Sequence, residues 1–308
     1  MTERTIHRLD PPAWFWKIAL AGAAAIWGGS FVVLKDTLDA VTPAWLMAVR
    51  FLLAGLVLSV VFHRSLARNL DGSHVLAAAI LGGIGGVAFT VQNVGLVYIS
   101  PGRNAFLTAV YSVLVPFFTW ALYCQRPATH NVAGALLAVA GVGFLSLGDD
   151  LSVSLGFGDW LTLLCAVLYA LQITLGAHLL PAHDVRTVTA LQMGFTGLSA
   201  LVMALVTEPM PDFAVFVTGP VLASMAYLVL LSSCLCYVIQ NVGQTKVPAA
   251  DAGLLLSLES VFAVIASVIF YGEELTPRLV VGFALIFVAI VVSELGPTLV
   301  ARIRSAAE

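Results

Sequence analysis

Charged residues are scarce in this chain of 308 residues, in which Asp, Glu, Lys and Arg occupy only 10% of positions. A soluble globular chain is about one quarter charged. The 14 basic and 17 acidic residues give a net charge of -3, so the chain lacks the basic surface that nucleic-acid binding requires. Hydrophobic residues fill 60% of positions. This composition excludes a soluble enzyme and a disordered protein, and it indicates a polytopic membrane protein.

Metal, nucleotide and disulfide signatures are also missing. Four cysteines are too few for a disulfide framework in a chain of this length. Cys234 and Cys236 are two residues apart, and on a helix such residues do not face each other, so they are a poor zinc site. The six histidines lack metal-ligand spacing, and neither a Walker motif nor a dinucleotide fingerprint occurs. We therefore expect no metal and no cofactor, and ATP-driven pumping would need a separate subunit.

Ten apolar stretches are long enough to cross a bilayer as helices, each of which needs about 20 mostly apolar residues. They are apolar on every face, unlike the alternating strands of porins. The stretches are 15–34, 43–62, 74–98, 104–123, 131–148, 158–179, 187–206, 219–243, 250–271 and 278–296. The sequence therefore predicts an all-α integral membrane protein with ten transmembrane helices, between polar tails at 1–14 and 297–308.

Basic residues in the short loops predict the orientation, because Lys and Arg are retained on the cytoplasmic side. With the amino terminus inside, ten basic residues lie inside and three lie outside, the latter being Lys35, Arg103 and Arg278. The reverse orientation would invert this bias. Both termini are therefore expected in the cytoplasm, with Lys35 and Arg103 as anchors at the outer boundary.

The chain repeats itself internally. An offset of 148 residues aligns Gln92-Asn93-Val94-Gly95 with Gln240-Asn241-Val242-Gly243, and without a gap it also pairs Tyr123 with Tyr271 and Gly148 with Gly296. The sequence thus predicts two repeats of five helices, at 15–148 and 156–296. Because five is odd, the second copy enters the membrane from the opposite face. Inverted repeats of this kind are typical of transporters, whose halves rock around a site near the midplane.

Short motifs in the same order and spacing resemble the EamA branch of the drug/metabolite transporter superfamily. They are Trp27-Gly28-Gly29-Ser30-Phe31, Arg50-Phe51, the stretch 100–108 before Val113-Leu114-Val115-Pro116, and Leu258-Glu259-Ser260-Val261 before Tyr271-Gly272-Glu273-Glu274. The resemblance implies a carrier of small metabolites. Two residues depart from the family pattern: Ser260 replaces a common Pro, and Gln125 replaces a common acid at the end of the fourth helix. The second departure suggests that the closing contacts of the two halves have diverged.

Two ionisable residues lie inside the expected spans. Glu259 lies nine positions into its helix, roughly 14 Å from the start, which is near the midplane. A carboxylate at this depth is costly unless it is paired, neutralised or exposed to a water-filled cavity, so we expect it to couple protons or bind a substrate amine. The alternative is a packing carboxyl bonded to a neighbouring helix. Arg50 either binds a substrate carboxylate or snorkels outward and ties down helix ends.

Other polar side chains inside the spans are weaker candidates for substrate binding. Gln92 and Gln240 occupy matching depths, where amides line a cavity or bond across helices. Aromatic rings away from the membrane interfaces line a cavity or simply pack, and Tyr111 is also the repeat counterpart of Glu259. The remaining candidates are Trp27, Ser30, Tyr169, Gln172, Gln192 and Tyr237.

We therefore expect a secondary transporter of the cytoplasmic membrane that moves a small amino acid-like or amphipathic solute by alternating access. The resemblance implies efflux, and Glu259 suggests a proton as the coupling ion. The expected partners are the solute and the lipid bilayer, the protein being a monomer or a homodimer. The alternatives are a passive channel and an integral-membrane enzyme acting on a lipid-linked substrate, although the chain lacks a cluster of catalytic acids, histidines or metal ligands.

Overall fold

The computed structural model describes residues 11–145, 155–243, 246, 247 and 249–307, and the regular structure of these residues is helical. The long helices of the first half are α1 (Ala13–Thr37), α2 (Pro43–Val61), α4 (Gly72–Tyr98), α5 (Pro101–Ala109), α6 (Tyr111–Tyr123) and α7 (Thr129–Leu145), with the short α3 (His63–Asn69) after α2. Those of the second half are α8 (Phe157–Leu179), α9 (Val185–Thr207), α10 (Gly219–Ala226), α11 (Cys236–Gly243), α12 (Ala249–Ala266) and α13 (Pro277–Ala307).

Two π-helical segments continue these helices. The segment η3 (Tyr227–Leu235) joins α10 to α11 in one continuous rod, and η4 (Ser267–Tyr271) extends α12. Short 3-10 turns lie at Leu180–Ala182 and Phe213–Val217. Helical stretches of the π type are rare and often lie at functional sites, because they redirect side chains within a helix.

Eight helices of the described chain have the length and composition to cross a membrane. They are Ala13–Thr37, Pro43–Val61, Gly72–Tyr98, Pro101–Tyr123, Phe157–Ala182, Val185–Thr207, Gly219–Gly243 and Pro277–Gly296. The two other expected spans coincide with shorter apolar helices, Thr129–Leu145 and Leu255–Tyr271. The expectation of an all-helical membrane protein is therefore confirmed.

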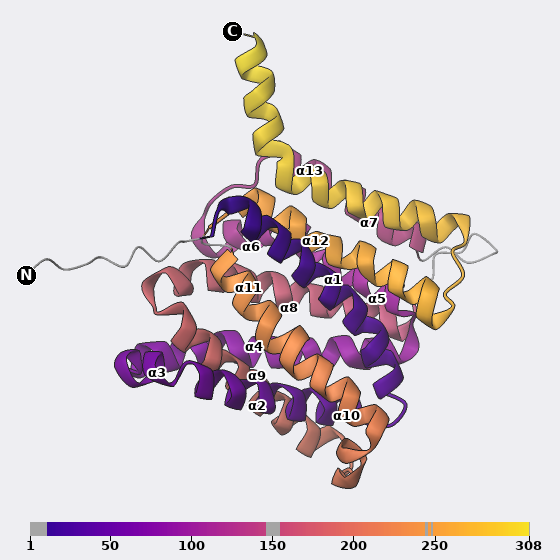
Figure 1. Ribbon diagram of the computed structural model, residues 1–308. Coiled ribbons are helices and arrows are strands. Elements are labelled where there is room, and N and C mark those ends of the chain that lie inside the picture. Colours follow the sequence, from indigo (N-terminus) through magenta and orange to yellow (C-terminus); the bar gives the residue numbers. More distant parts are fainter. Residues whose placement is uncertain (1–10, 146–154, 244–245, 248, 308) are drawn as a thin grey trace, which may run out of the picture.

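The structure differs from the expected tails at one end. Helix α13 continues to Ala307, past the end of the span at Gly296, so the expected polar tail 297–308 is helical up to that residue and leads away from the bundle (Figure 1). Residues 1–10 of the expected amino-terminal tail and the end of the span 131–148 lie outside the described residues.

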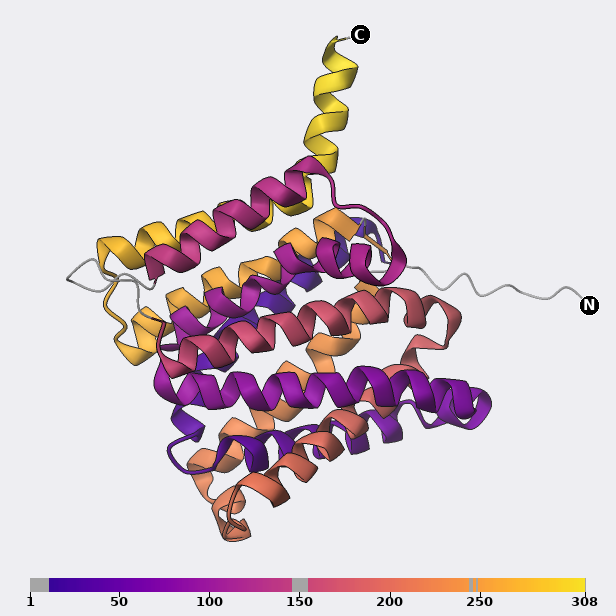
Figure 2. The same cartoon turned by 180° about the vertical axis from the view of Figure 1, so that it is seen from behind.

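The helices pack in pairs that come from both halves of the chain. Helix α2 packs along α9, α7 along α13, and α1 along α12, while α4 contacts both α8 and α9. Figures 1 and 2 show the α7–α13 pair at one end of the bundle and the α2–α9 pair at the other, with α1, α4, α5, α6, α8, α11 and α12 between them. Each half therefore completes its packing with helices of the other half.

Glycines allow the closest of these contacts. A Cβ atom added to Gly28 on α1 would lie 2.6 Å from the Phe262 side chain and 2.8 Å from the Glu259 carbonyl on α12. On α2, a Cβ at Gly55 would lie 2.6 Å from the backbone nitrogen of Gly194 on α9. Small residues let membrane helices approach to backbone contact, which gains dispersion energy where lipid offers no hydrophobic driving force.

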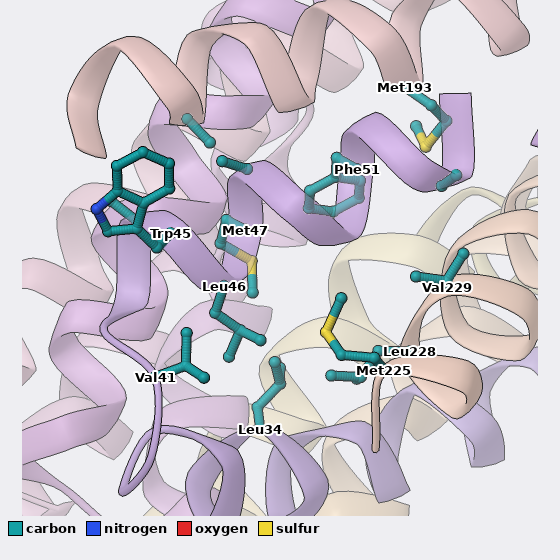
Figure 3. Packing of buried hydrophobic residues seen from close by; sticks show 14 of the residues in the cluster. Leu34, Val41, Trp45, Leu46, Met47, Phe51, Met193, Met225, Leu228 and Val229 are labelled. Carbon is teal, nitrogen blue, oxygen red and sulfur yellow. The ribbon is translucent and has the colours of Figure 1, made fainter. Parts of the chain in front are cut away.

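A large apolar core lies between α2 and η3. It contains Trp45, Met47 and Phe51 of α2 together with Met225 and Leu228, and Figure 3 shows these side chains converging. Phe51 is completely buried and follows Arg50 directly, so the core fixes the backbone that carries this arginine. A second core joins α5 and α6 to α13, where the rings of Phe106 and Phe283 stack at 4.4 Å.

Two turns adopt matching backbone conformations. Cys124 ends α6 with φ of 59° and Gly272 follows η4 with φ of 71°, so both are left-handed, and they are 148 residues apart. A left-handed residue is unfavourable for side chains other than glycine, so this conformation at Cys124 is imposed by the turn. The two left-handed residues are thus separated by the same offset that aligns the sequence with itself.

Candidate functional site

Glu259 lies on α12 among polar side chains from several other helices. It is half-buried, and no described residue donates a hydrogen bond to its carboxylate. Its electrostatic neighbours are Arg50, Tyr111, Cys165, Tyr169, Cys236 and Tyr237. We call Glu259, these neighbours and the residues bonded to them the central polar cluster.

The Arg50 guanidinium forms the cationic part of the central polar cluster. Arg50 is 2% exposed, so it does not snorkel outward to the interface. Its Nε donates to the Ser233 hydroxyl and its Nη2 to the Ser232 hydroxyl, each at 2.9 Å. The rings of Phe51 and Phe89 lie 4.8 and 5.8 Å from its central carbon, which stabilises the buried cation. Arg50 and Glu259 interact electrostatically without forming an ion pair.

Trp27 and Ser30 of α1 join this cation to the cluster. Trp27 Nε1 donates to the Ser232 carbonyl at 2.7 Å, and the Ser30 and Ser232 hydroxyls lie 2.8 Å apart. The half-buried Trp27 ring meets the half-buried Tyr237 ring edge to face at 5.7 Å. Indole and phenol groups are apolar on their faces and polar at their tips, so this ring pair can contact both apolar and polar groups.

On the other side of the cluster, Gln92 of α4 bridges two helices. Its Nε2 donates to the Thr108 hydroxyl of α5 at 2.9 Å, and its Oε1 accepts from the Tyr169 hydroxyl of α8 at 3.1 Å. The Tyr111 ring packs edge to face against the Tyr169 ring at 6.2 Å. Gln92 is therefore hydrogen-bonded at both ends of its amide, which fixes the Tyr169 ring beside Glu259.

The remaining amides that we expected in the site have different surroundings. Gln172 donates to the Leu81 carbonyl at 2.7 Å, a contact between α8 and α4 outside the central polar cluster. Gln192 is buried on α9, and its carbonyl contacts Gly82 of α4. Gln240 is half-buried on α11, one turn beyond Tyr237. The structure therefore brings Gln240 near the cluster but puts Gln172 and Gln192 at helix contacts.

Three hydroxyl residues of the cluster, Ser232, Ser233 and Thr108, were not among the site residues expected from the sequence, whereas Ser30 was. Ser232 and Ser233 are completely buried on η3, and Thr108 is 5% exposed on α5. Hydroxyl residues are common in membrane helices, where they usually bond to their own backbone, as Thr174 does to the Ala170 carbonyl. A signal that was available is the pair Ser232-Ser233 in the middle of an apolar run.

Polar contacts outside the central polar cluster hold the ends of several helices in place. On one side Lys35 donates to the carbonyls of Leu96, Val97 and Ile99 at 2.6–3.2 Å, which satisfies the carboxyl end of α4. Arg103 forms a bidentate pair with Asp159 at 2.7 and 2.8 Å. Both residues therefore tie down helix ends, in agreement with the anchoring role expected from their positions.

Helix α9 begins at a half-buried carboxylate on the opposite side. Asp184 accepts from the Thr187 backbone nitrogen at 2.9 Å and from the Ser65 hydroxyl at 2.5 Å. Burial opposes ionisation of Asp184, but these hydrogen bonds outweigh it, so its pKa lies below the ordinary value of 3.8. At the start of α4, Asp71 accepts from the His74 backbone nitrogen and ring, and these bonds lower its pKa as well.

Surface grooves lie elsewhere on the molecule. One of about 360 Å³ runs over α4 and α9, and one of about 380 Å³ lies beside the turn at Ala40–Thr42. Their linings are Gly83, Val87, Phe195, Leu198, Ser199, Val202 and Met203 for the first, and Ala40, Val41, Thr42, Pro209, Met210, Pro211, Asp212 and Val215 for the second. Neither contains a residue of the central polar cluster, which therefore stands as the candidate site on its chemistry.

A bundle of membrane-length helices around a buried cation and a half-buried carboxylate defines a multi-pass membrane protein with an intramembrane polar site. The family model described as the EamA-like transporter family matches residues 14–147 and 156–295. The chain therefore belongs to the EamA-like transporter family, and the resemblance noted in the sequence is confirmed.

Several relatives carry transporter names. An uncharacterized transporter of Archaeoglobus fulgidus is 31% identical over 287 residues, which cover 90% of this chain and 85% of that protein. The uncharacterized transporter YetK of Bacillus subtilis is 27% identical over 83% of this chain and 79% of its own length. The threonine/homoserine exporter RhtA of Escherichia coli is 28% identical over 59% of each chain. These names are those of transporters, not of enzymes.

The fold is shared with a solved structure. A crystal structure matches 94% of this chain and 99% of its own chain with a TM-score of 0.64 at 19% sequence identity. At this identity the likeness concerns the arrangement of the helices alone.

Proposed function

We propose that the protein is a secondary active transporter that moves an amino acid-like solute out of the cell across the cytoplasmic membrane by alternating access. The observation that carries this proposal is the central polar cluster, in which Arg50 and Glu259 interact electrostatically without forming an ion pair. The name of RhtA, an exporter of threonine and homoserine, supports both the solute class and the direction.

The two charges suit a zwitterion. A guanidinium binds a carboxylate through two parallel hydrogen bonds, and a carboxylate accepts from an ammonium group. Arg50 takes the carboxylate of the solute and Glu259 its amine, while Trp27 and Tyr237 contact the apolar part. The half-burial of Glu259, Trp27 and Tyr237 supports access for a small solute, because part of each residue stays accessible.

We assign alternating access to two inverted repeats of five transmembrane helices, at 15–148 and 156–296, with both termini in the cytoplasm. The two segments of the family match and the left-handed turns at Cys124 and Gly272 support this division. Helix pairing supports it too, because α2 packs on α9 and α7 on α13, which are counterparts in the two repeats. The central polar cluster then lies between the repeats, where rocking exposes it to each side in turn.

Glu259 couples transport to protons in this proposal. A half-buried carboxylate without a hydrogen-bond donor gains more from protonation or from a substrate amine than a solvated carboxylate does. Proton and substrate then compete for one group, which links an inward proton gradient to outward movement of the solute. The protein works as a monomer or a homodimer, with lipid around the bundle.

Reconstituted protein tests the proposal. Proteoliposomes are loaded with unlabelled L-threonine, and uptake of labelled L-threonine is measured with and without a pH gradient. We expect saturable counterflow, which a passive channel does not give, and gradient-driven accumulation that Glu259→Gln abolishes. Glu274→Gln is the matched control, because this carboxylate is exposed on the turn after η4. Full gradient-driven accumulation by Glu259→Gln would contradict the coupling role.

A further inference from the structure

Ser232 connects three of the residues in the central polar cluster. It is completely buried in the middle of η3. Its hydroxyl contacts Arg50 Nη2 at 2.9 Å and the Ser30 hydroxyl at 2.8 Å, while its carbonyl accepts from Trp27 Nε1 at 2.7 Å. One small residue thus holds groups from α1 and α2 at defined distances.

The directions of these hydrogen bonds follow from the chemistry of the groups. A guanidinium only donates, so the Ser232 oxygen accepts from Arg50. The Ser30 hydroxyl carries one proton, which it donates to the Ile26 carbonyl at 2.9 Å. The Ser232 proton therefore goes to Ser30. The result is a directed chain from Arg50 through Ser232 and Ser30 to the backbone of α1.

Both serines that bond to Arg50 lie in the π-helical segment η3. Ser232 and Ser233 are consecutive, yet both hydroxyls reach the same guanidinium, one at Nη2 and the other at Nε. Consecutive residues of an α-helix point about 100° apart, which spreads neighbouring hydroxyls around the axis. The Ser232 carbonyl accepts from Trp27, a side-chain donor from another helix.

The guanidinium held in this way lacks a negative partner. Among the described residues no carboxylate forms an ion pair with Arg50, whose hydrogen bonds go to two neutral hydroxyls. A buried charge without a counterion is costly, and the aromatic rings of Phe51 and Phe89 offset only part of that cost. A carboxylate from a bound solute would supply the missing charge.

We propose that Ser232 is the positioning residue of an anion subsite: it orients the Arg50 guanidinium to receive the carboxylate of the transported solute and links that subsite to α1. This inference rests on the proposed function, in which Arg50 takes the carboxylate. Ser232 itself acts through Arg50, since its single proton is already committed to Ser30.

Ligand titration of purified protein tests the inference. The thermal unfolding midpoint is followed against L-threonine, against the other proteinogenic amino acids, and against L-threoninamide, which keeps the amine but lacks the carboxylate. Stabilisation by a ligand reports its affinity for the folded state. The variants are Ser232→Ala, Ser232→Thr, which keeps the hydroxyl, and Ser199→Ala as a control. Ser199 also bonds across helices, to the Gly83 carbonyl at 3.2 Å, but outside the cluster.

We expect Ser232→Ala to weaken amino acid binding about tenfold, the factor that corresponds to losing one hydrogen bond to a charged group. The weak effect of the amide should not change, because that ligand does not use Arg50. Ser232→Thr should stay within about threefold of the unmodified protein, and Ser199→Ala should match it. If Ser232→Ala does not fold, Ser30→Ala, which removes the acceptor of the Ser232 proton, takes its place with the same expected direction.

The two proposals fail in different ways. If amino acids stabilise the unmodified protein and Ser232→Ala binds them equally well, the positioning role is wrong and the proposed function stands. If the acid and the amide lose affinity equally, Ser232 only supports the fold and the positioning role is again wrong. If no compound with a carboxylate stabilises the unmodified protein, both the anion subsite and the proposed solute class are refuted.

Discussion

Glu273 joins the start of α5 to η4, on the side of the bundle where Arg103 also lies. It is half-buried after the left-handed Gly272, and it accepts from the Ser100 hydroxyl, from the Gly102 backbone nitrogen at 3.1 Å and from the Ser267 hydroxyl at 2.5 Å. A Cβ at Gly102 would lie 2.5 Å from the carboxylate, so the glycine leaves room for it. We expect this carboxylate to keep the amino-terminal half of α5, and hence this side of the bundle, closed.

The magnitude follows from these three hydrogen bonds. A bond to a buried charged group contributes about 1.5–3 kcal/mol, and solvent screening reduces this for a half-buried residue. Glu273→Gln keeps one acceptor oxygen but replaces the other by a donor that cannot accept from Gly102 or a serine. We expect this variant to destabilise the closed arrangement by about 2 kcal/mol. This shifts the equilibrium between the closed and the open arrangement roughly thirtyfold toward the open one.

Thiol accessibility measures this equilibrium. Ala105, 3% exposed on α5, is replaced by Cys in a background in which the four native cysteines are changed to Ala or Ser. A membrane-impermeant thiol reagent should modify that cysteine up to about thirtyfold faster when Glu273→Gln is added, and Glu274→Gln should leave the rate unchanged. Equal rates with and without Glu273→Gln would show that the carboxylate does not control the closed arrangement.

Three further changes test the packing and the helix ends by thermal unfolding. Asp184→Ala should cost about 1 kcal/mol at neutral pH by removing a helix cap. Because the native pKa of Asp184 is lowered, its contribution is complete above the ordinary value of 3.8 and is lost as the pH falls below it, so Asp184→Asn should unfold with a weaker pH dependence there. Gly28→Ala should separate α1 from α12 and abolish transport, whereas Gly22→Ala should be neutral, because an added Cβ there meets nothing within 4 Å. Arg103→Lys should cost about 1 kcal/mol, because an ammonium cannot reproduce the bidentate pair with Asp159.

Much of the architecture could be predicted from the sequence, because the cost of exposing backbone polar groups to lipid leaves few choices. The ends of the helices follow local rules, such as Pro43 in the first turn of α2 and Asp71 at the start of α4. The continuation of α13 to Ala307 was not predictable from hydropathy, which ends at the membrane boundary although the helix does not.

The charged and aromatic members of the site, together with Ser30 and Gln92, were predictable from the sequence, but Ser232, Ser233 and Thr108 were not. An arginine or a glutamate within an apolar span is too costly to be incidental, so Arg50 and Glu259 stood out. Ser232 did not, because serines are common in membrane helices and the pair Ser232-Ser233 carries no charge that would be costly in an apolar run. Gln172 was expected in the site but lies outside it. An amide within a span can donate its hydrogen bond to a backbone carbonyl of a neighbouring helix, here that of Leu81, as well as to a group in a site.

The two left-handed turns, at Cys124 and Gly272, can be compared directly because they lie at the offset that aligns the sequence with itself. Cys124 and Gly272 share a backbone conformation at an offset of 148 residues, but the residues that follow them differ. Glu273 is engaged with Ser100, Gly102 and Ser267, whereas Gln125 is exposed and bonds to no described side chain. A carboxylate accepts more hydrogen bonds than an amide oxygen does. The turn at Gly272 is therefore held by several hydrogen bonds to Glu273, whereas the turn at Cys124 lacks such bonds among the described residues. In the proposed alternating-access cycle, unequal contacts at the two turns would favour one arrangement, and we expect the side that carries Gln125 to open more easily than the side that carries Glu273.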